Sequence, residues 1–181
     1  MRASRLNAAF QSRYTIAGVA PGPRAAVLAL VALLVAAGLA CTACSRHSGA
    51  ERAPTACAGG VASDREAAIQ SALMKAPGPV ALPDGTRLSD CLAHPVDGGD
   101  LETIGSTMLK VTQQLADATA GGGNAAALTQ LGYLIGAMHR GAARAGGAND
   151  ELVRRLDQEL QDVDVGSPAY RAGERAGRST G

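Results

Sequence analysis

The sequence predicts an all-α fold, a small bundle of about four helices stapled by one disulfide. Between residues 61 and 163, apolar side chains recur at helical spacing in segments that glycines and prolines separate. Each segment has one apolar face, so none spans a membrane and all must bury that face against one another, as in a bundle. The chain thereby divides into a leader (1–43), a flexible tether (44–60), the helical domain (61–163) and a disordered tail (164–181).

The first predicted helix begins at Ser63 and ends near Lys75. Ser63 and Glu66 have the spacing of a capping box, in which the serine hydroxyl accepts a hydrogen bond from the Glu66 amide and the glutamate reaches back. The segment Ala76-Pro77-Gly78-Pro79 stops the helix, because proline cannot continue it.

A loop over residues 77–90 follows, with Pro83-Asp84-Gly85 as a turn. Ser89 is expected to cap one short helical turn that carries Cys91. Cys57 and Cys91 are an even pair downstream of the leader, so we predict a disulfide between them. Closing a loop of roughly 35 residues would contribute about 3–4 kcal/mol to stability.

The second and third helices are the longest. The second begins at Asp100 and ends at the glycines 121–123, and the third begins near Asn124 and ends near Gly146. Each has a stripe of apolar residues at helical spacing. The stripes are Leu101, Ile104, Met108, Val111 and Leu115 in the second helix, and Leu128, Leu131, Leu134, Ile135, Met138 and Ala142 in the third.

The fourth helix begins at Asn149-Asp150-Glu151, where acidic residues favour the positive end of the helix dipole. Arg155 lies four residues from both Glu151 and Glu159, the spacing of helical ion pairs. The apolar stripe of this helix is Leu152, Leu156, Leu160 and Val163.

An apolar run, Ala25–Ala40, dominates the leader. Arginines precede it and no acidic residue occurs before Glu51, which is the pattern of an export signal. The positive-inside rule then places everything after Ser45 outside the cytoplasm. Because the basic segment ahead of the run is long for a signal peptide, an uncleaved transmembrane anchor is the alternative.

The end of this run, Leu39-Ala40-Cys41-Thr42-Ala43-Cys44-Ser45, resembles the lipobox of bacterial lipoproteins. The resemblance covers the leader alone, and it implies cleavage before a diacylglyceryl-modified cysteine that holds the protein on the membrane. Where a lipobox has leucine, three residues before the cysteine, Cys41 has a glycine and Cys44 has a cysteine. Cleavage at Cys44 leaves an even cysteine pair, whereas cleavage at Cys41 leaves Cys44 unpaired, so we favour Cys44.

Composition excludes several function classes. Without the four leader arginines, 13 basic residues face 16 acidic ones, a net charge of −3, which argues against a nucleic-acid partner. Tyr133 is the one aromatic residue of the predicted domain, and this disfavours glycan binding, which needs stacking platforms. His47, His94 and His139 lack a second ligand at a recurrent metal spacing, so we expect no metal and no cofactor.

Two features of the third helix bear on function. Gly132 and Gly136 each cost about 1 kcal/mol relative to alanine, so close packing of a neighbouring helix is expected over Gly132. Tyr133, Arg140 and Arg144 project together at about 100° per residue, away from the apolar stripe. This surface is either a solvated helix face or a site for a protein partner, because tyrosine and arginine anchor protein interfaces.

We therefore predict a membrane-anchored lipoprotein outside the cytoplasm, with a helical domain that serves as an interaction or adaptor module of the cell envelope. One alternative is a structural envelope protein with an uncleaved anchor. The other is an enzyme that gathers His94 or His139 with carboxylates such as Asp90, Asp97 or Asp100, although no catalytic motif occurs.

Overall fold

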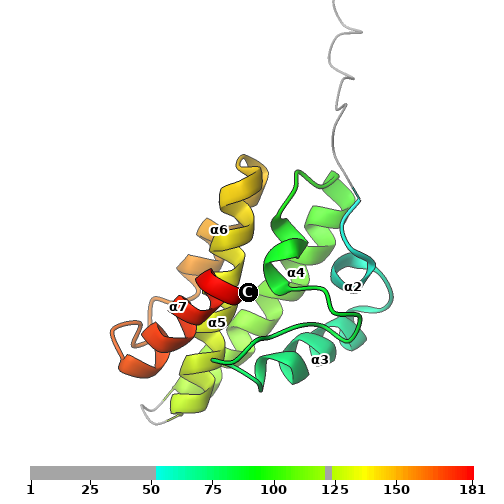
Figure 1. Ribbon diagram of the computed structural model, residues 1–181. Helices are drawn as coiled ribbons and strands as arrows, with labels where there is room; N and C mark the ends of the chain where they lie inside the picture. Colours follow the sequence, from blue (N-terminus) through cyan, green and yellow to red (C-terminus); the bar gives the residue numbers. More distant parts are fainter. Residues whose placement is uncertain (1–51, 121–123) are drawn as a thin grey trace, which may run out of the picture. The chain divides into compact units, whose positions relative to one another are not determined.

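Helices make up most of the computed structural model, which describes residues 52–120 and 124–181 (Figure 1). The all-α prediction is confirmed for these residues, which include no named β-strand; an isolated β-bridge joins Ala81 to Arg87. A disulfide joins Cys57 to Cys91, also as predicted. The elements are α2 (Thr55–Ala58), α3 (Ala62–Leu73), the 3₁₀ helix η2 (Leu88–Leu92), α4 (Gly98–Thr119), α5 (Ala125–Ala145), α6 (Ala148–Gln158) and α7 (Pro168–Thr180).

Helix α5 is the centre of the bundle and contacts α3, α4, α6, α7 and η2. Its predicted stripe is buried from Leu131 to Ala142, and the α4 stripe is buried from Ile104 to Leu115. Leu101, the first residue of the α4 stripe, is instead only partly buried. The largest fully buried side chains outside α5 are Ile69, Leu73, Leu88, Leu92, Ile104, Met108 and Leu156.

Side-chain caps fix where α4 and α5 begin. Asp97 accepts a hydrogen bond from the Asp100 amide at 2.9 Å, and Asn124 accepts one from the Ala127 amide at 3.0 Å. The capping box predicted at Ser63 is wrong, because α3 begins at Ala62 and Ser63 already lies inside its first turn. Its hydroxyl bonds the Asp64 carboxylate at 3.4 Å instead.

The prediction of a disordered tail is wrong for residues 168–180, which form α7. Ser167 caps this helix by accepting a hydrogen bond from the Tyr170 amide at 3.3 Å, and Pro168 occupies its first position. Helix α7 lies beside α5 (Figure 1). Tyr170, Gly173 and Gly177 form its buried face.

Glycines on both helices bring α5 and α7 into backbone contact. A Cβ placed on Gly132 would lie 2.2 Å from the Tyr170 carbonyl oxygen, and one on Gly173 would lie 2.0 Å from the Thr129 carbonyl oxygen. Gly136 meets residues one turn further along α7, so the two helices run in the same direction. The expected close packing over Gly132 is confirmed, and the neighbour is a helix that the sequence reading did not predict.

The tether prediction also fails at its end. Residues 55–58 form α2, Cys57 is fully buried, and the Ala53 amide donates to an Asp100 carboxylate oxygen at 3.0 Å. The chain is therefore fixed to α4 from Ala53 onwards. Within the described residues, no helix has both the length and the apolar character needed to cross a membrane.

Candidate functional site: a groove between α4 and α6

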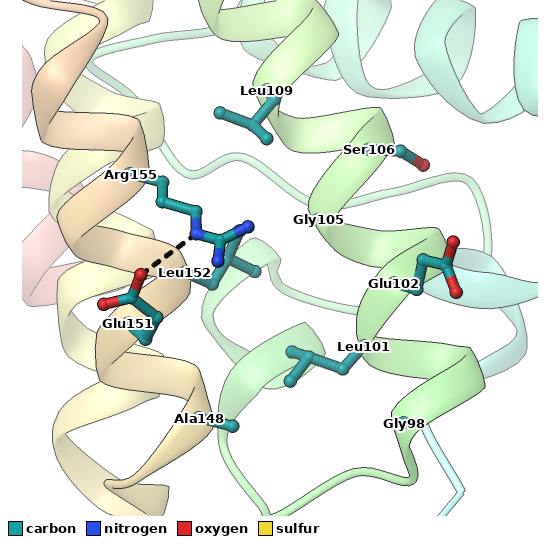
Figure 2. A pocket seen from close by; sticks show the side chains of 10 residues that line it. All are labelled: Gly98, Leu101, Glu102, Gly105, Ser106, Leu109, Ala148, Glu151, Leu152 and Arg155. Carbon is teal, nitrogen blue, oxygen red and sulfur yellow. Dashed lines mark hydrogen bonds and ion pairs between the residues drawn. The ribbon is translucent and has the colours of Figure 1, made fainter.

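A groove of about 460 Å³ lies between α4 and α6 (Figure 2). Such a volume falls within the range of ligand sites, about 300–1,000 Å³. Its floor is apolar, with Leu101 and Leu109 from α4 and Leu152 from α6. Gly98 and Ala148 lie at the same end of the groove in Figure 2, so the two helices run in the same direction along it.

Small residues on the facing sides set the shape of the groove. Gly105 lies within α4 opposite Leu152, and a Cβ at Gly105 would lie 3.2 Å from a Leu152 methyl carbon. Leu152 therefore seats against the α4 backbone and forms the floor. Further along, Gln113 donates to the Glu159 carboxylate at 3.1 Å and ties the two helices together.

Ionised side chains flank this apolar floor. On α6, Glu151 accepts hydrogen bonds from Arg154 at 2.7 and 2.8 Å and from the Arg155 Nε at 3.0 Å. Hydrogen bonds from Arg154, and then from Arg155, lower the pKa of Glu151 to about 2. On α4, Glu102 is exposed and has no ion-pair partner within residues 52–120 and 124–181.

The groove was not predicted from the sequence, because the spacing of Leu101 places it in the apolar stripe of the core. The available signal was Gly105, a helix-interior glycine beside that stripe. Neither Leu101 nor Leu109 is fully covered by the core, and both are only partly buried.

The surface predicted from Tyr133, Arg140 and Arg144 does not exist as an exposed partner site. Tyr133 is fully buried, because Gly132 and Gly136 beside it admit the α7 backbone. Its hydroxyl accepts a hydrogen bond from the Val80 amide at 3.2 Å and lies 3.1 Å from the Thr180 hydroxyl.

Both arginines of that predicted surface have intramolecular roles. Arg140 donates to the Arg178 and Ser179 carbonyl oxygens, which are among the unpaired acceptors at the end of α7. Arg144 forms an ion pair of 3.6 Å with Asp90. The tyrosine–arginine face of α5 therefore binds α7 and η2 of the same chain.

The residues of the enzyme alternative are dispersed. His139 pairs with Asp157 at 3.0 Å, a carboxylate that the sequence reading had not selected, in a shallow cleft that His94 does not line. Asp97 caps α4 and Asp100 accepts from the Ala53 amide, so both carboxylates have structural partners. Across the described ranges, no cluster of three histidine, cysteine or acidic side chains could hold a metal ion.

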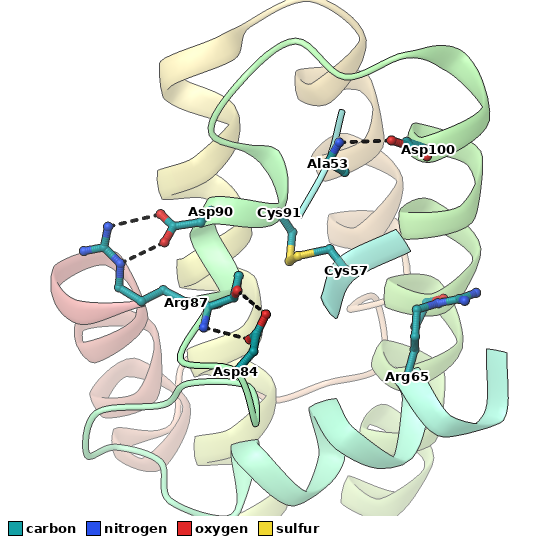
Figure 3. Close-up of a disulfide and its surroundings, with 10 residues drawn as sticks. Ala53, Cys57, Arg65, Asp84, Arg87, Asp90, Cys91 and Asp100 are labelled. Carbon is teal, nitrogen blue, oxygen red and sulfur yellow. Dashed lines mark hydrogen bonds and ion pairs between the residues drawn. A yellow bond between two sulfur atoms is a disulfide. The ribbon is translucent and has the colours of Figure 1, made fainter. Parts of the chain in front are cut away.

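The disulfide is the predicted site that the structure does form (Figure 3). Cys57 on α2 and Cys91 on η2 are both fully buried, with Cα atoms 5.6 Å apart. On one side, Arg87 and Asp90 form an exposed ion pair of 3.0 Å. The lipidation candidates Cys41 and Cys44 lie outside the described residues.

Comparisons with protein families, with curated proteins and with solved structures found no match to this chain.

Proposed function

We propose that this protein is a bacterial lipoprotein of the cell envelope, anchored by a lipid on Cys44 and exposed outside the cytoplasm. The observation that carries the proposal is the buried Cys57–Cys91 disulfide. Disulfides persist mainly in oxidising compartments, and this one uses both cysteines that follow Cys44. The sequence before Cys44 supports both export and lipidation: a basic leader and an apolar run have the pattern of an export signal, and small residues surround Cys44 as in a lipobox.

We further propose that the helical domain acts as a protein-interaction module rather than as an enzyme. The α4/α6 groove supports this role, because an apolar floor between flanking charges is the composition of many protein-binding surfaces. The predicted catalytic groups, in contrast, have structural partners or lie outside one cleft.

Intact-mass analysis of the protein extracted from membranes tests the anchor. We expect the loss of residues 1–43 together with an added lipid mass, and a Cys44→Ser variant should lose both. A mature N-terminus at Cys41 would move the modification there. An unmodified, full-length N-terminus would contradict the proposal and favour a transmembrane anchor. Spectra with and without reductant report the disulfide.

In-cell photo-crosslinking tests the interaction role. A photoreactive residue at Ser106, which is exposed at the groove, should give a discrete protein adduct. The matched control is the exposed Asp64 on α3, which should give none. Adducts of equal yield from both positions, or from neither, would contradict an interaction module at this groove.

A further inference from the structure

We infer that the α4/α6 groove binds an amphipathic helix of a partner protein, one that carries a basic residue on one flank and an acidic residue on the other. The basic flank would face Glu102 of α4, and the acidic flank would face Arg155 of α6. This inference rests on the proposed interaction function and specifies the class of partner.

The dimensions of the groove suit a helix. From Leu101 to Leu109 the floor follows nine residues of α4, about 12 Å of helix axis or roughly two turns. A docked helix can fill this length with side chains at positions i, i+4 and i+7, as in other helix-in-groove complexes. Gly98 and Ala148 leave space for such side chains because they have little or no side chain of their own, whereas the space beside Gly105 is filled by Leu152 of the floor.

The two flanks of the groove carry opposite charges with unused hydrogen-bonding capacity. The Glu102 carboxylate has no partner in the described part of the chain. Arg155 uses only its Nε towards Glu151, so its two terminal nitrogens remain without partners among the same residues. Figure 2 shows Arg155 reaching from α6 towards α4, with Glu102 on the outer edge of α4.

Glu151 does not cancel the charge of Arg155, because Arg154 holds the same carboxylate through two shorter hydrogen bonds. These three residues together carry one net positive charge at neutral pH. The acidic α4 flank and the basic α6 flank therefore resemble the flanking positions of a coiled-coil seam, which select partners by charge.

This pattern favours a helix over an acyl chain. A fatty acid carries its charge at one end and would satisfy one flank at most. A helix presents side chains along both edges of its apolar stripe, so it can pair with Glu102 and Arg155 at once.

The test uses three fluorescent helical peptides and the full chain in lipid nanodiscs. All three have leucines at i, i+4 and i+7. The mixed peptide carries lysines on one flank and glutamates on the other. The all-lysine peptide carries lysines on both flanks, and the all-glutamate peptide carries glutamates on both. Because reversing a docked helix exchanges its flanks, the mixed peptide satisfies both charges in one of its two directions, whichever flank carries the lysines. We expect it to bind about tenfold more tightly than either other peptide, measured by fluorescence anisotropy.

Charge reversal then identifies the flanks. Glu102→Lys should shift the preference to the all-glutamate peptide, and Arg155→Glu should shift it to the all-lysine peptide. Asp117→Lys, on α4 outside the groove, is the matched control and should keep the preference for the mixed peptide. Glu102 and Asp117 are exposed and have no ion pairs within the described ranges, so these two variants should fold like the parent.

A diazirine in place of one leucine should crosslink to residues 98–109 and 148–155. Equal affinities for all three peptides, preferences that survive Glu102→Lys, or crosslinks elsewhere would overturn the inference. Two further results would also overturn the inference: binding of a fatty acid without binding of any peptide, and dimerisation of this chain that Ala148→Trp abolishes. Lipidation is measured separately by mass, so failure of the anchor and failure of the groove give different results.

Discussion

Replacing Gly173 by alanine tests whether α7 is docked on α5. In an isolated helix this change gains about 1 kcal/mol, because alanine has the higher helix propensity. In the docked arrangement the new Cβ would lie 2.0 Å from the Thr129 carbonyl oxygen and 2.9 Å from the Tyr133 amide nitrogen. Both contacts are with backbone, so no side chain can rotate away and α7 must shift.

The expected net effect is a loss of about 2 kcal/mol. Overpacking costs typically 1–3 kcal/mol and more where backbone must move, and the gain in helix propensity offsets part of it. For a domain of this size, the loss lowers the melting temperature by about 8 °C, at roughly 4 °C per kcal/mol. Gly98→Ala is the matched control, since nothing lies within 4 Å of its Cβ position.

Thermal unfolding followed by circular dichroism measures the difference, and trypsin reports release of α7 by cutting at the exposed Arg171 and Arg175. Adding Gly132→Ala to the Gly173 variant should cost little more, because α7 is by then displaced. A melting temperature that stays level or rises in Gly173→Ala would refute the docked arrangement of α7.

Three further predictions concern the disulfide and two ionisable groups. Replacing Cys57 and Cys91 by serine should lower the free energy of unfolding by about 3–4 kcal/mol, measured by urea denaturation, with no further loss on adding reductant. The pKa of Glu151 is lowered from 4.5 to about 2, so its ionised form contributes stability above pH 4.5 that is lost as the pH falls towards 2. In denaturation experiments at a series of pH values, the stability difference between the parent and Glu151→Gln should therefore vanish near pH 2. Burial, and then the nearby Glu174 carboxylate, raise the pKa of Tyr170, so its neutral phenol contributes stability below pH 10 that is lost at higher pH. The free energy of unfolding of Tyr170→Phe should therefore fall less steeply with pH above pH 10 than that of the parent. An unchanged alkaline transition would count against burial of this ring.

Local signals predicted much of the fold. Apolar spacing located the long helices α4 and α5, and the asparagine at 124 was a readable start for the second of them. Cysteine parity predicted the disulfide without any knowledge of geometry. Where a cap failed, as at Ser63, the helix still formed, because burial of Ile69 and Leu73 stabilises it more than one capping hydrogen bond does.

Non-local contacts explain the errors. Helix α7 has little apolar periodicity, since its buried face is one tyrosine and two glycines. Its start signal, Ser167 before Pro168, was present in the sequence but carried no indication of what the helix packs against. Tyr133 lies off the apolar stripe of α5 and looked solvent-facing until a second helix covered it.

The sequence by itself determined the helices of the central domain, the disulfide pair and the expectation of an exported, lipid-anchored chain. These features depend on residue spacing, caps and cysteine number, which are properties of neighbours along the chain. Only the tertiary structure decided that α7 covers the tyrosine–arginine face of α5 and that a groove opens between α4 and α6. The roles of the glycines and of the partly buried leucines depend on which helix packs against them, and spacing along the chain does not identify that helix.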